Sequence, residues 1–170
     1  MDGKLSLPAH FTASAFVLRS DRRVLLLNHK KLGVWLYPGG HVEEMETPDG
    51  AAIREVFEES GRHVRILGER DDVLNDPETG VQALHTPYRV LCEHIQDKHG
   101  PHYHIDMIYL CKPGSVADCK DFGASDIGFF TFEQTHSMKL FPNFRRMLAD
   151  VYRNDRLWQL LREQVQEHAL

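Results

Sequence analysis

Cysteine is scarce in this sequence, and its three cysteines do not suggest a covalent framework. Cys92, Cys111 and Cys119 are widely spaced and form no Cys-x-x-Cys pair. An odd number of isolated cysteines argues against structural disulfides. We therefore expect reduced thiols and a cytoplasmic location.

Long apolar segments and a basic surplus are also missing. No run is long enough to cross a membrane, and the N-terminal residues contain no apolar signal segment, so we expect no membrane partner. The formal net charge is -5, which argues against general nucleic-acid binding because that function relies on basic surface. Repeats and low-complexity linkers are not evident, and 170 residues are enough for one domain, which we expect to span residues 1–170.

What the sequence does contain is a helix with strong terminal signals. Thr47 is a suitable N-cap, Pro48 suits the first helical position, and Asp49 complements the positive end of the helix. Gly61 is suited to a left-handed cap that ends the helix. These signals predict a helix from Thr47 to Ser60.

The predicted helix has one apolar side and one acidic side. The side expected to pack on a core carries Ala52, Ile53, Val56 and Phe57. The other carries Glu55, Glu58 and Glu59 at i,i+3 and i,i+4 spacings, where like charges destabilise a helix. A hard divalent cation would give those carboxylates a function. A solvated acidic face is the usual meaning of such a charge run, and the three glutamates alone favour it.

The complete spacing changes that interpretation. Gly40 is followed after five residues by Glu46 and, after seven more, by the run Arg54–Gly61. This pattern, over residues 40–62, resembles the Nudix box with every fixed position filled. One position departs from it, because Arg62 stands where a bulky aliphatic residue is usual, and Val64 could fill that gap.

The resemblance implies an α/β fold, a Nudix-type α/β/α sandwich with a mixed β-sheet. It implies hydrolysis of a diphosphate linkage in a nucleotide or nucleoside diphosphate derivative, with Mg²⁺ as cofactor and Mn²⁺ as a substitute. A nucleotide or another diphosphate-containing small molecule would be the partner. Two alternatives remain: a non-catalytic Nudix-fold nucleotide-binding or regulatory domain, and an isomerase of the isopentenyl-diphosphate type, for which Cys92 would have to serve. A buried strand cysteine is the simpler account of Cys92.

The resemblance also implies roles for particular residues. The implied metal ligands are Glu55, Glu58, Glu59 and the carbonyl of Gly39. Glu46 and Arg54 would hold the loop and helix in place, with Arg54 acting in the catalytic group beside Glu55 and Glu58. The general base would be Glu55, Glu58 or an acid from a distant loop, for which the candidates are Asp121 and Asp126.

Substrate contacts are less well specified by the sequence. Lys30 could meet phosphates, although exposed loop lysines are usually only solvated. Asp121 is a further candidate in a polar loop. Asn143 resembles in position a base-reading asparagine of MutT-like proteins, but a helix N-cap is the favoured interpretation.

Apolar patterns and turn residues predict the remaining elements. The expected strands are His10–Leu18, Val24–Leu27, Val64–Leu74, Ala83–Ile95, His102–Cys111 and Ile127–Phe132. A short helix is expected over Glu133–Leu140, followed by C-terminal helices at about 143–168. Apolar residues of the last helix would pack on the domain or form a homodimer face.

One predicted strand carries a polar face. Period two places His102, His104 and Asp106 on the same side. These side chains could bind a transition metal, but no fourth ligand is evident from sequence. Lining of a cleft or simple solvation of the sheet is favoured over a metal site.

Overall fold

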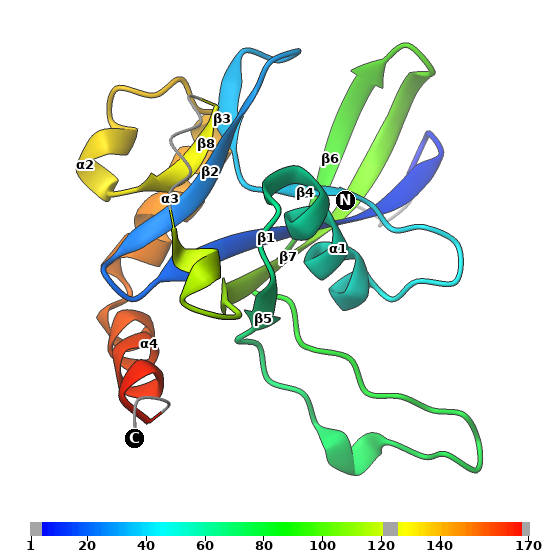
Figure 1. Cartoon of the computed structure of the whole chain (residues 1–170). Coiled ribbons are helices and arrows are strands. Elements are labelled where there is room, and N and C mark those ends of the chain that lie inside the picture. The colour runs from blue at the N-terminus through cyan, green and yellow to red at the C-terminus, as the bar shows by residue number, and fades with distance from the viewer. Residues whose placement is uncertain (1–4, 121–125, 168–170) are drawn as a thin grey trace.

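The computed structural model describes residues 5–120 and 126–167. Its strands are β1 (Ala9–Arg19), β2 (Arg23–His29), β3 (Val34–Leu36), β4 (Gly39–His41), β5 (Val64–Ile66), β6 (Arg89–Asp97), β7 (Gly100–Pro113) and β8 (Ile127–Phe130). Its helices are α1 (Pro48–Ser60), α2 (Phe132–Thr135), α3 (Pro142–Arg153) and α4 (Asp155–Glu167), with 3-10 turns at Asp72–Leu74 and Ala117–Cys119 (Figure 1). None of the helices in the described ranges is both long and apolar enough to cross a membrane.

The sheet is mixed and is organised around β1. This strand pairs in parallel with β7 and antiparallel with β2 and β4. β6 and β5 both pair antiparallel with β7, while β3 and β8 pair with β2. The turn residues at 97–101 predict that the strand after them pairs back antiparallel on the strand before them, and the pairing of β6 with β7 confirms this.

Each face of the sheet carries its own hydrophobic core. Side chains alternate along β1, so Ala13, Ala15 and Val17 pack on the face covered by α1, whereas Phe16 and Leu18 pack on the face covered by α3 and α4. The helical contribution to the second core consists of Phe144, Leu148, Val151, Tyr152, Leu157, Trp158 and Leu161. Helices on both faces of a mixed sheet confirm the predicted α/β/α sandwich.

The ends of α1 lie where the sequence predicts them. Thr47 Oγ1 accepts a hydrogen bond from the Gly50 N–H at 3.3 Å. Gly61 has φ 66° and donates its N–H to the Phe57 carbonyl. The predicted apolar face is only half right, because Ile53 and Phe57 are 38% and 47% exposed.

The true buried line of α1 runs through Ala51, Ala52 and Val56. Two small alanines let this line approach β1 closely, and the bulkier neighbours are left at the edge of the contact. Phe57 lies there against the ring of His63, with centroids 4.7 Å apart.

Two predicted strands are much shorter than expected. The strand predicted over Val64–Leu74 ends at Ile66, and that predicted over Ala83–Ile95 begins at Arg89. β5 finds pairing partners only along the last residues of β7, and Pro87 cannot donate to a ladder. The connection from 67 to 88 instead extends away from the sheet as a long loop (Figure 1).

The short helix predicted over Glu133–Leu140 is also reduced. The helix, α2, begins one residue earlier, at Phe132, where Thr131 and Gln134 form an N-terminal capping box. It ends at Thr135. Leu157, Trp158 and Leu161 of α4 are buried against the domain, which confirms the packing interpretation for them. Leu160 is exposed, and the homodimer stays a prediction.

Arg62 fills the position where an aliphatic residue was expected. It is 1% exposed, its guanidinium lies 5.4 Å from the centroid of the Phe129 ring, and it donates to the carbonyls of Ser60 and Lys120. Val64 is buried two residues later, as predicted. The long arginine side chain thus replaces apolar packing with stacking and hydrogen bonds.

Candidate functional site

The acidic side of α1 faces the glycine strand β4. The Gly39 N–H donates to Glu59 Oε2 at 3.0 Å. A Cβ at Gly40 would lie within 3 Å of the Glu55 carboxylate, so a larger residue there would displace that side chain. The sheet register fixes β4 in turn, because Gly39 pairs with Ser14 of β1. The structure therefore brings the predicted loop and the predicted carboxylates together.

Arg54 connects three of the acidic side chains. Its Nε and Nη2 each lie 2.9 Å from an oxygen of Glu46. Its Nη1 donates to Glu55 at 2.7 Å and to Glu58 at 3.1 Å. The bond to Arg54 lowers the pKa of Glu46 below its usual range, and the same pairing raises the pKa of the guanidinium.

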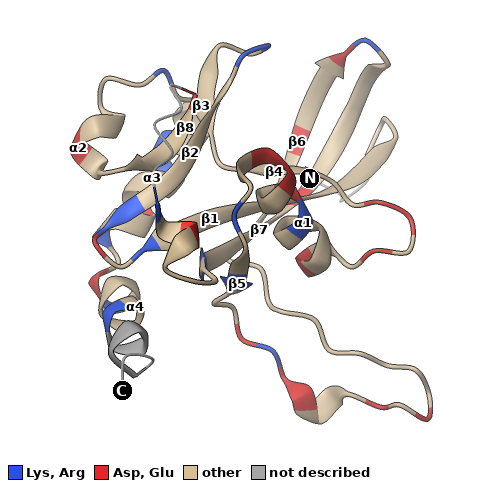
Figure 2. Ribbon diagram, viewed as in Figure 1, with Lys and Arg blue, Asp and Glu red and all other residues tan. Residues whose placement is uncertain are grey.

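The third carboxylate of the helix has the opposite electrostatic setting. Burial raises the pKa of Glu59, the Gly39 N–H opposes that rise, and the negative charges of Glu55 and Glu58 add to it. Figure 2 shows acidic positions gathered on α1 and on the loop that precedes it. Such a group of carboxylates repels itself and has the oxygen donors that hard cations require.

Glu59 and the glycine strand border a cavity of about 720 Å³, which Glu55 and Glu58 do not line. Gly39, Gly40 and Glu59 form one part of its wall, and Tyr37 and Phe141 supply aromatic surface. The volume lies within the range typical of small-molecule sites, about 300–1,000 Å³.

Two further acids line the cavity: Asp106, which belongs to the polar face predicted on the strand at 102–111, and Glu93. Asp106 is buried and accepts from Thr12, Ser14 and Tyr37 at 3.0, 2.9 and 3.2 Å. Burial raises its pKa, partly offset by the two hydroxyls from β1 and that of Tyr37. Glu93 was missed: burial and then the charge of Asp106 raise its pKa. Its only signal was alternation along β6, and the sequence did not show which face of that strand borders a cavity.

The predicted substrate residues separate into different places. Asn143 lines the cavity, and the N-cap of α3 is Phe141, so the cap interpretation of Asn143 is wrong. Pro142 occupies the first helical position and shifts the helix start by one residue. Lys30 is not among the lining residues; its Nζ lies 3.0 Å from Asp126, while Lys31 lines the cavity.

Two other candidate residues remain to be placed. Asp121 lies outside the described residues. Cys92 is exposed on β6 and does not line the cavity, so the interpretation as a buried cysteine is wrong. Alternation on β6 turns its side chain to the face opposite Glu93.

The polar face predicted on β7 has formed, with additional histidines. His102 and His104 have their Nε2 atoms 3.0 Å apart. His10 and His41 join them from β1 and β4. Burial, followed by the charges of the other three histidines, lowers the pKa of His104 to about 4. The sequence could not bring these residues together because three different strands carry them.

A family comparison agrees with the arrangement of helix, glycine strand and sheet. The NUDIX domain model matches residues 8–151. The chain belongs to the NUDIX family. It is similar to a MutT-like protein of Streptomyces ambofaciens, 38% identical over 80 residues that cover 46% of this chain and 51% of the relative.

Other relatives extend the comparison. A probable DHNTP pyrophosphohydrolase of Lactococcus lactis is 32% identical over 97 residues, covering 54% of this chain and 58% of that protein. A NUDIX-family hydrolase structure from Clostridium perfringens aligns with a TM-score of 0.68 and 26% identity, covering 84% of this chain and 95% of that one. The chain spans about half the length of the curated relatives it matches.

Proposed function

We propose that this NUDIX protein hydrolyses a diphosphate linkage in a nucleotide or nucleoside diphosphate derivative, using Mg²⁺ with Mn²⁺ as an alternative. The observation that carries the proposal is the position of Glu59, which accepts from Gly39 at the wall of a ligand-sized cavity, while Arg54 joins Glu55 and Glu58 of the same helix. The relatives described as pyrophosphohydrolase and MutT-like support the same reaction class.

The donor set fits a hard divalent cation. Glu55, Glu58, Glu59 and the carbonyl of Gly39 would hold it, because Mg²⁺ prefers carboxylate and carbonyl oxygens. Burial and, to a smaller extent, the charges of Glu55 and Glu58 raise the pKa of Glu59, and a bound cation would offset those charges. When bound, the metal supplies neutralisation of phosphate charge and acidification of a coordinated water.

The chain's own residues supply orientation and proton transfer. Arg54 acts as a positioning residue, because one Nη1 atom bridges Glu55 and Glu58. In the hydrolysis, a water oxygen forms a bond to one phosphorus, the bridging P–O bond breaks, and a water proton passes to a carboxylate. Glu55 and Glu58 are the candidate bases. Glu58 is the more accessible, with 56% of its side chain exposed against 14% for Glu55.

The cavity suggests how a nucleotide would be held. Phe141 and Tyr37 offer aromatic surface for a base, and Asn143 offers an amide that can both donate and accept. Lys31, rather than Lys30, is the lining lysine that could approach phosphate. The metal-binding carboxylates would place the diphosphate at the Gly39 end.

Product formation from a panel of nucleoside triphosphates, nucleotide sugars and dinucleotides tests the proposal. Each substrate is incubated with Mg²⁺, with Mn²⁺ and with chelator. Cleavage should require metal, and Glu58→Gln or Glu59→Gln should reduce kcat by about 10²–10⁴-fold, the range for loss of a positioned acid or base.

Glu78→Gln is the matched control. Glu78 is an exposed glutamate in the 67–88 loop, outside the cavity lining. It should retain full turnover, and all three variants should keep the wild-type circular dichroism and unfolding midpoint. Binding of these compounds without cleavage, in a folded protein with metal present, would instead identify the non-catalytic binding domain.

A further inference from the structure

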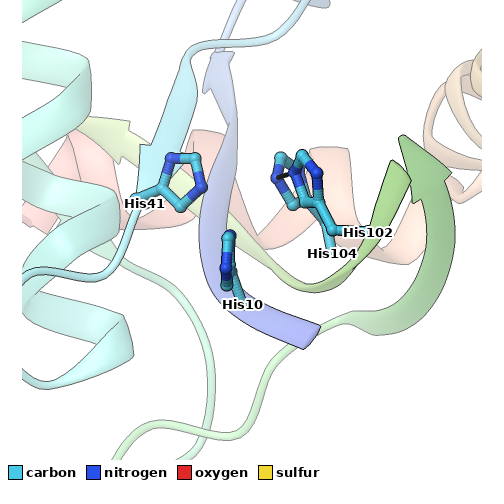
Figure 3. A group of neighbouring side chains, drawn as sticks. All are labelled: His10, His41, His102 and His104. Carbon is cyan, nitrogen blue, oxygen red and sulfur yellow. Dashed lines mark hydrogen bonds between the residues drawn. The ribbon is translucent and has the colours of Figure 1, made fainter. Parts of the chain in front are cut away.

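Sheet register gathers four histidines from three strands. In the parallel pairing of β1 and β7, His10 lies opposite His104, and His102 is two residues earlier on the same face. In the antiparallel pairing of β1 and β4, His41 lies opposite Thr12, two residues after His10. Because neighbours across a ladder share a face, all four rings project to the same side of the sheet (Figure 3).

We propose that these four imidazoles bind one transition-metal ion of the zinc class. The site shares no ligand with the carboxylates of α1, although His41 and His104 line the same cavity as Glu59. One ring nitrogen from each histidine can be chosen so that all four lie within 4.8 Å of one another. A tetrahedral ion with metal–nitrogen distances of about 2.0–2.1 Å requires ligand nitrogens about 3.3 Å apart. The Nε2 atoms of His102 and His104 are already 3.0 Å apart.

The other two ligands, His10 and His41, can move to reduce the 4.8 Å spread of the four nitrogens to tetrahedral spacing. His10 and His41 are exposed, so their rings can rotate without disturbing a packed core. Their ring centroids lie 5.5 Å apart, and that of His41 lies 4.8 Å from that of His104. Small changes in two surface side chains therefore suffice to reach tetrahedral spacing.

The surroundings of His102 suit a metal ligand. Its Nδ1 lies 3.0 Å from the Gly100 carbonyl, which can only accept, so Nδ1 carries the hydrogen and Nε2 keeps a lone pair directed at the cluster. Asp97 Oδ1 lies 4.0 Å from the same Nδ1. A carbonyl and a carboxylate behind the ligating ring are the usual partners that orient histidine at metal sites.

The donor type decides the metal. Four imidazole nitrogens suit Zn²⁺, Cu²⁺ or Ni²⁺, whereas Mg²⁺ and Mn²⁺ prefer oxygen. The ion would join the beginning of β1, the strand β4 and the β6–β7 hairpin. It would also restrain β4 near the box, because the His41 carbonyl accepts from Arg54 Nη2 at 2.9 Å.

Metal titration of the full chain, prepared without an oligohistidine tag, tests the site. Zn²⁺ binding is measured by calorimetry in buffer with saturating Mg²⁺, and Co²⁺ serves as an optical probe of tetrahedral coordination. We expect one Zn²⁺ per chain, a tetrahedral Co²⁺ spectrum, and a higher unfolding midpoint with Zn²⁺.

Variants locate the binding. His10→Gln combined with His41→Gln changes only exposed side chains. It should weaken Zn²⁺ binding by more than about 100-fold, which exceeds the loss expected when a residue that only hydrogen-bonds to a metal ligand is removed. His63→Gln combined with His99→Gln removes two exposed histidines outside the cluster and should bind as wild type. Glu58→Gln combined with Glu59→Gln should also bind as wild type, which separates this site from the proposed Mg²⁺ site.

Three results would overturn the proposal. The first is the absence of stoichiometric Zn²⁺ binding. The second is a His10/His41 double variant that binds Zn²⁺ as tightly as wild type. The third is a loss of Zn²⁺ binding in the Glu58/Glu59 double variant but not in the His10/His41 double variant. None of them bears on hydrolysis, which is measured separately with Mg²⁺.

Discussion

Arg54 forms a bidentate ion pair with Glu46, in which Nε and Nη2 each lie 2.9 Å from a carboxylate oxygen. The pair ties the first residues of the box to the middle of α1. Both side chains are about one-fifth exposed, so solvent screens the pair only in part. The remaining nitrogen of Arg54 is thereby directed at Glu55 and Glu58.

Glu46→Gln should expose the contribution of this pair through pH. The folded-state pKa of Glu46 is lowered, so its stabilisation is complete above the unfolded pKa of about 4.3 and is lost as pH falls through the folded value. At pH 6 the variant should be less stable by about 1.5 kcal/mol, the lower end for hydrogen bonds to charged groups. Urea unfolding from pH 6 to pH 3 should show the difference between wild type and variant shrinking. A constant difference would contradict the assignment.

Arg54→Lys should lower turnover while leaving the protein folded. A lysine ammonium cannot reproduce the planar fork that contacts Glu46, Glu55 and Glu58 together. We expect kcat with Mg²⁺ to fall by about 10–100-fold, the typical cost of losing a group that orients metal ligands. Steady-state kinetics would check this. A large rise in KM with unchanged kcat would indicate substrate contact instead.

Gly61→Ala should destabilise the protein by about 1–2 kcal/mol. Gly61 has φ 66°, and a Cβ there would meet no atom within 4 Å, so the cost is backbone strain alone. Gly61→Asn should cost less, because asparagine tolerates the left-handed region better. Denaturant unfolding of both variants measures the difference, and equal losses would argue against strain as the cause.

Arg62→Ala should destabilise by about 2–4 kcal/mol. Truncation removes the stacking on Phe129 and leaves the carbonyls of Ser60 and Lys120 without this donor. Arg62→Leu restores apolar bulk but not the hydrogen bonds, and should fall between alanine and wild type. Thermal and urea unfolding rank the three proteins. A leucine variant as stable as wild type would mean that bulk alone matters at this position.

Features that depend on neighbours along the chain could be predicted from the sequence. Thr47 and Gly61 bound α1 because caps act within one turn. The spacing from Gly40 to Gly61 predicted which carboxylates would share a helix face and, through the family pattern, the sandwich fold. The strand centres of β1, β2 and β7 followed from apolar runs and turn residues.

Features that depend on partners distant in the sequence could be seen only once the chain was folded. Strand ends depend on what lies opposite, so β5 stops after Ile66 and β6 starts at Arg89. The exposure of Ile53 and Phe57 depends on how α1 rotates onto β1, which the helical period does not fix. The four-histidine cluster depends on the register of β1 with both β7 and β4, and no local pattern encodes that register.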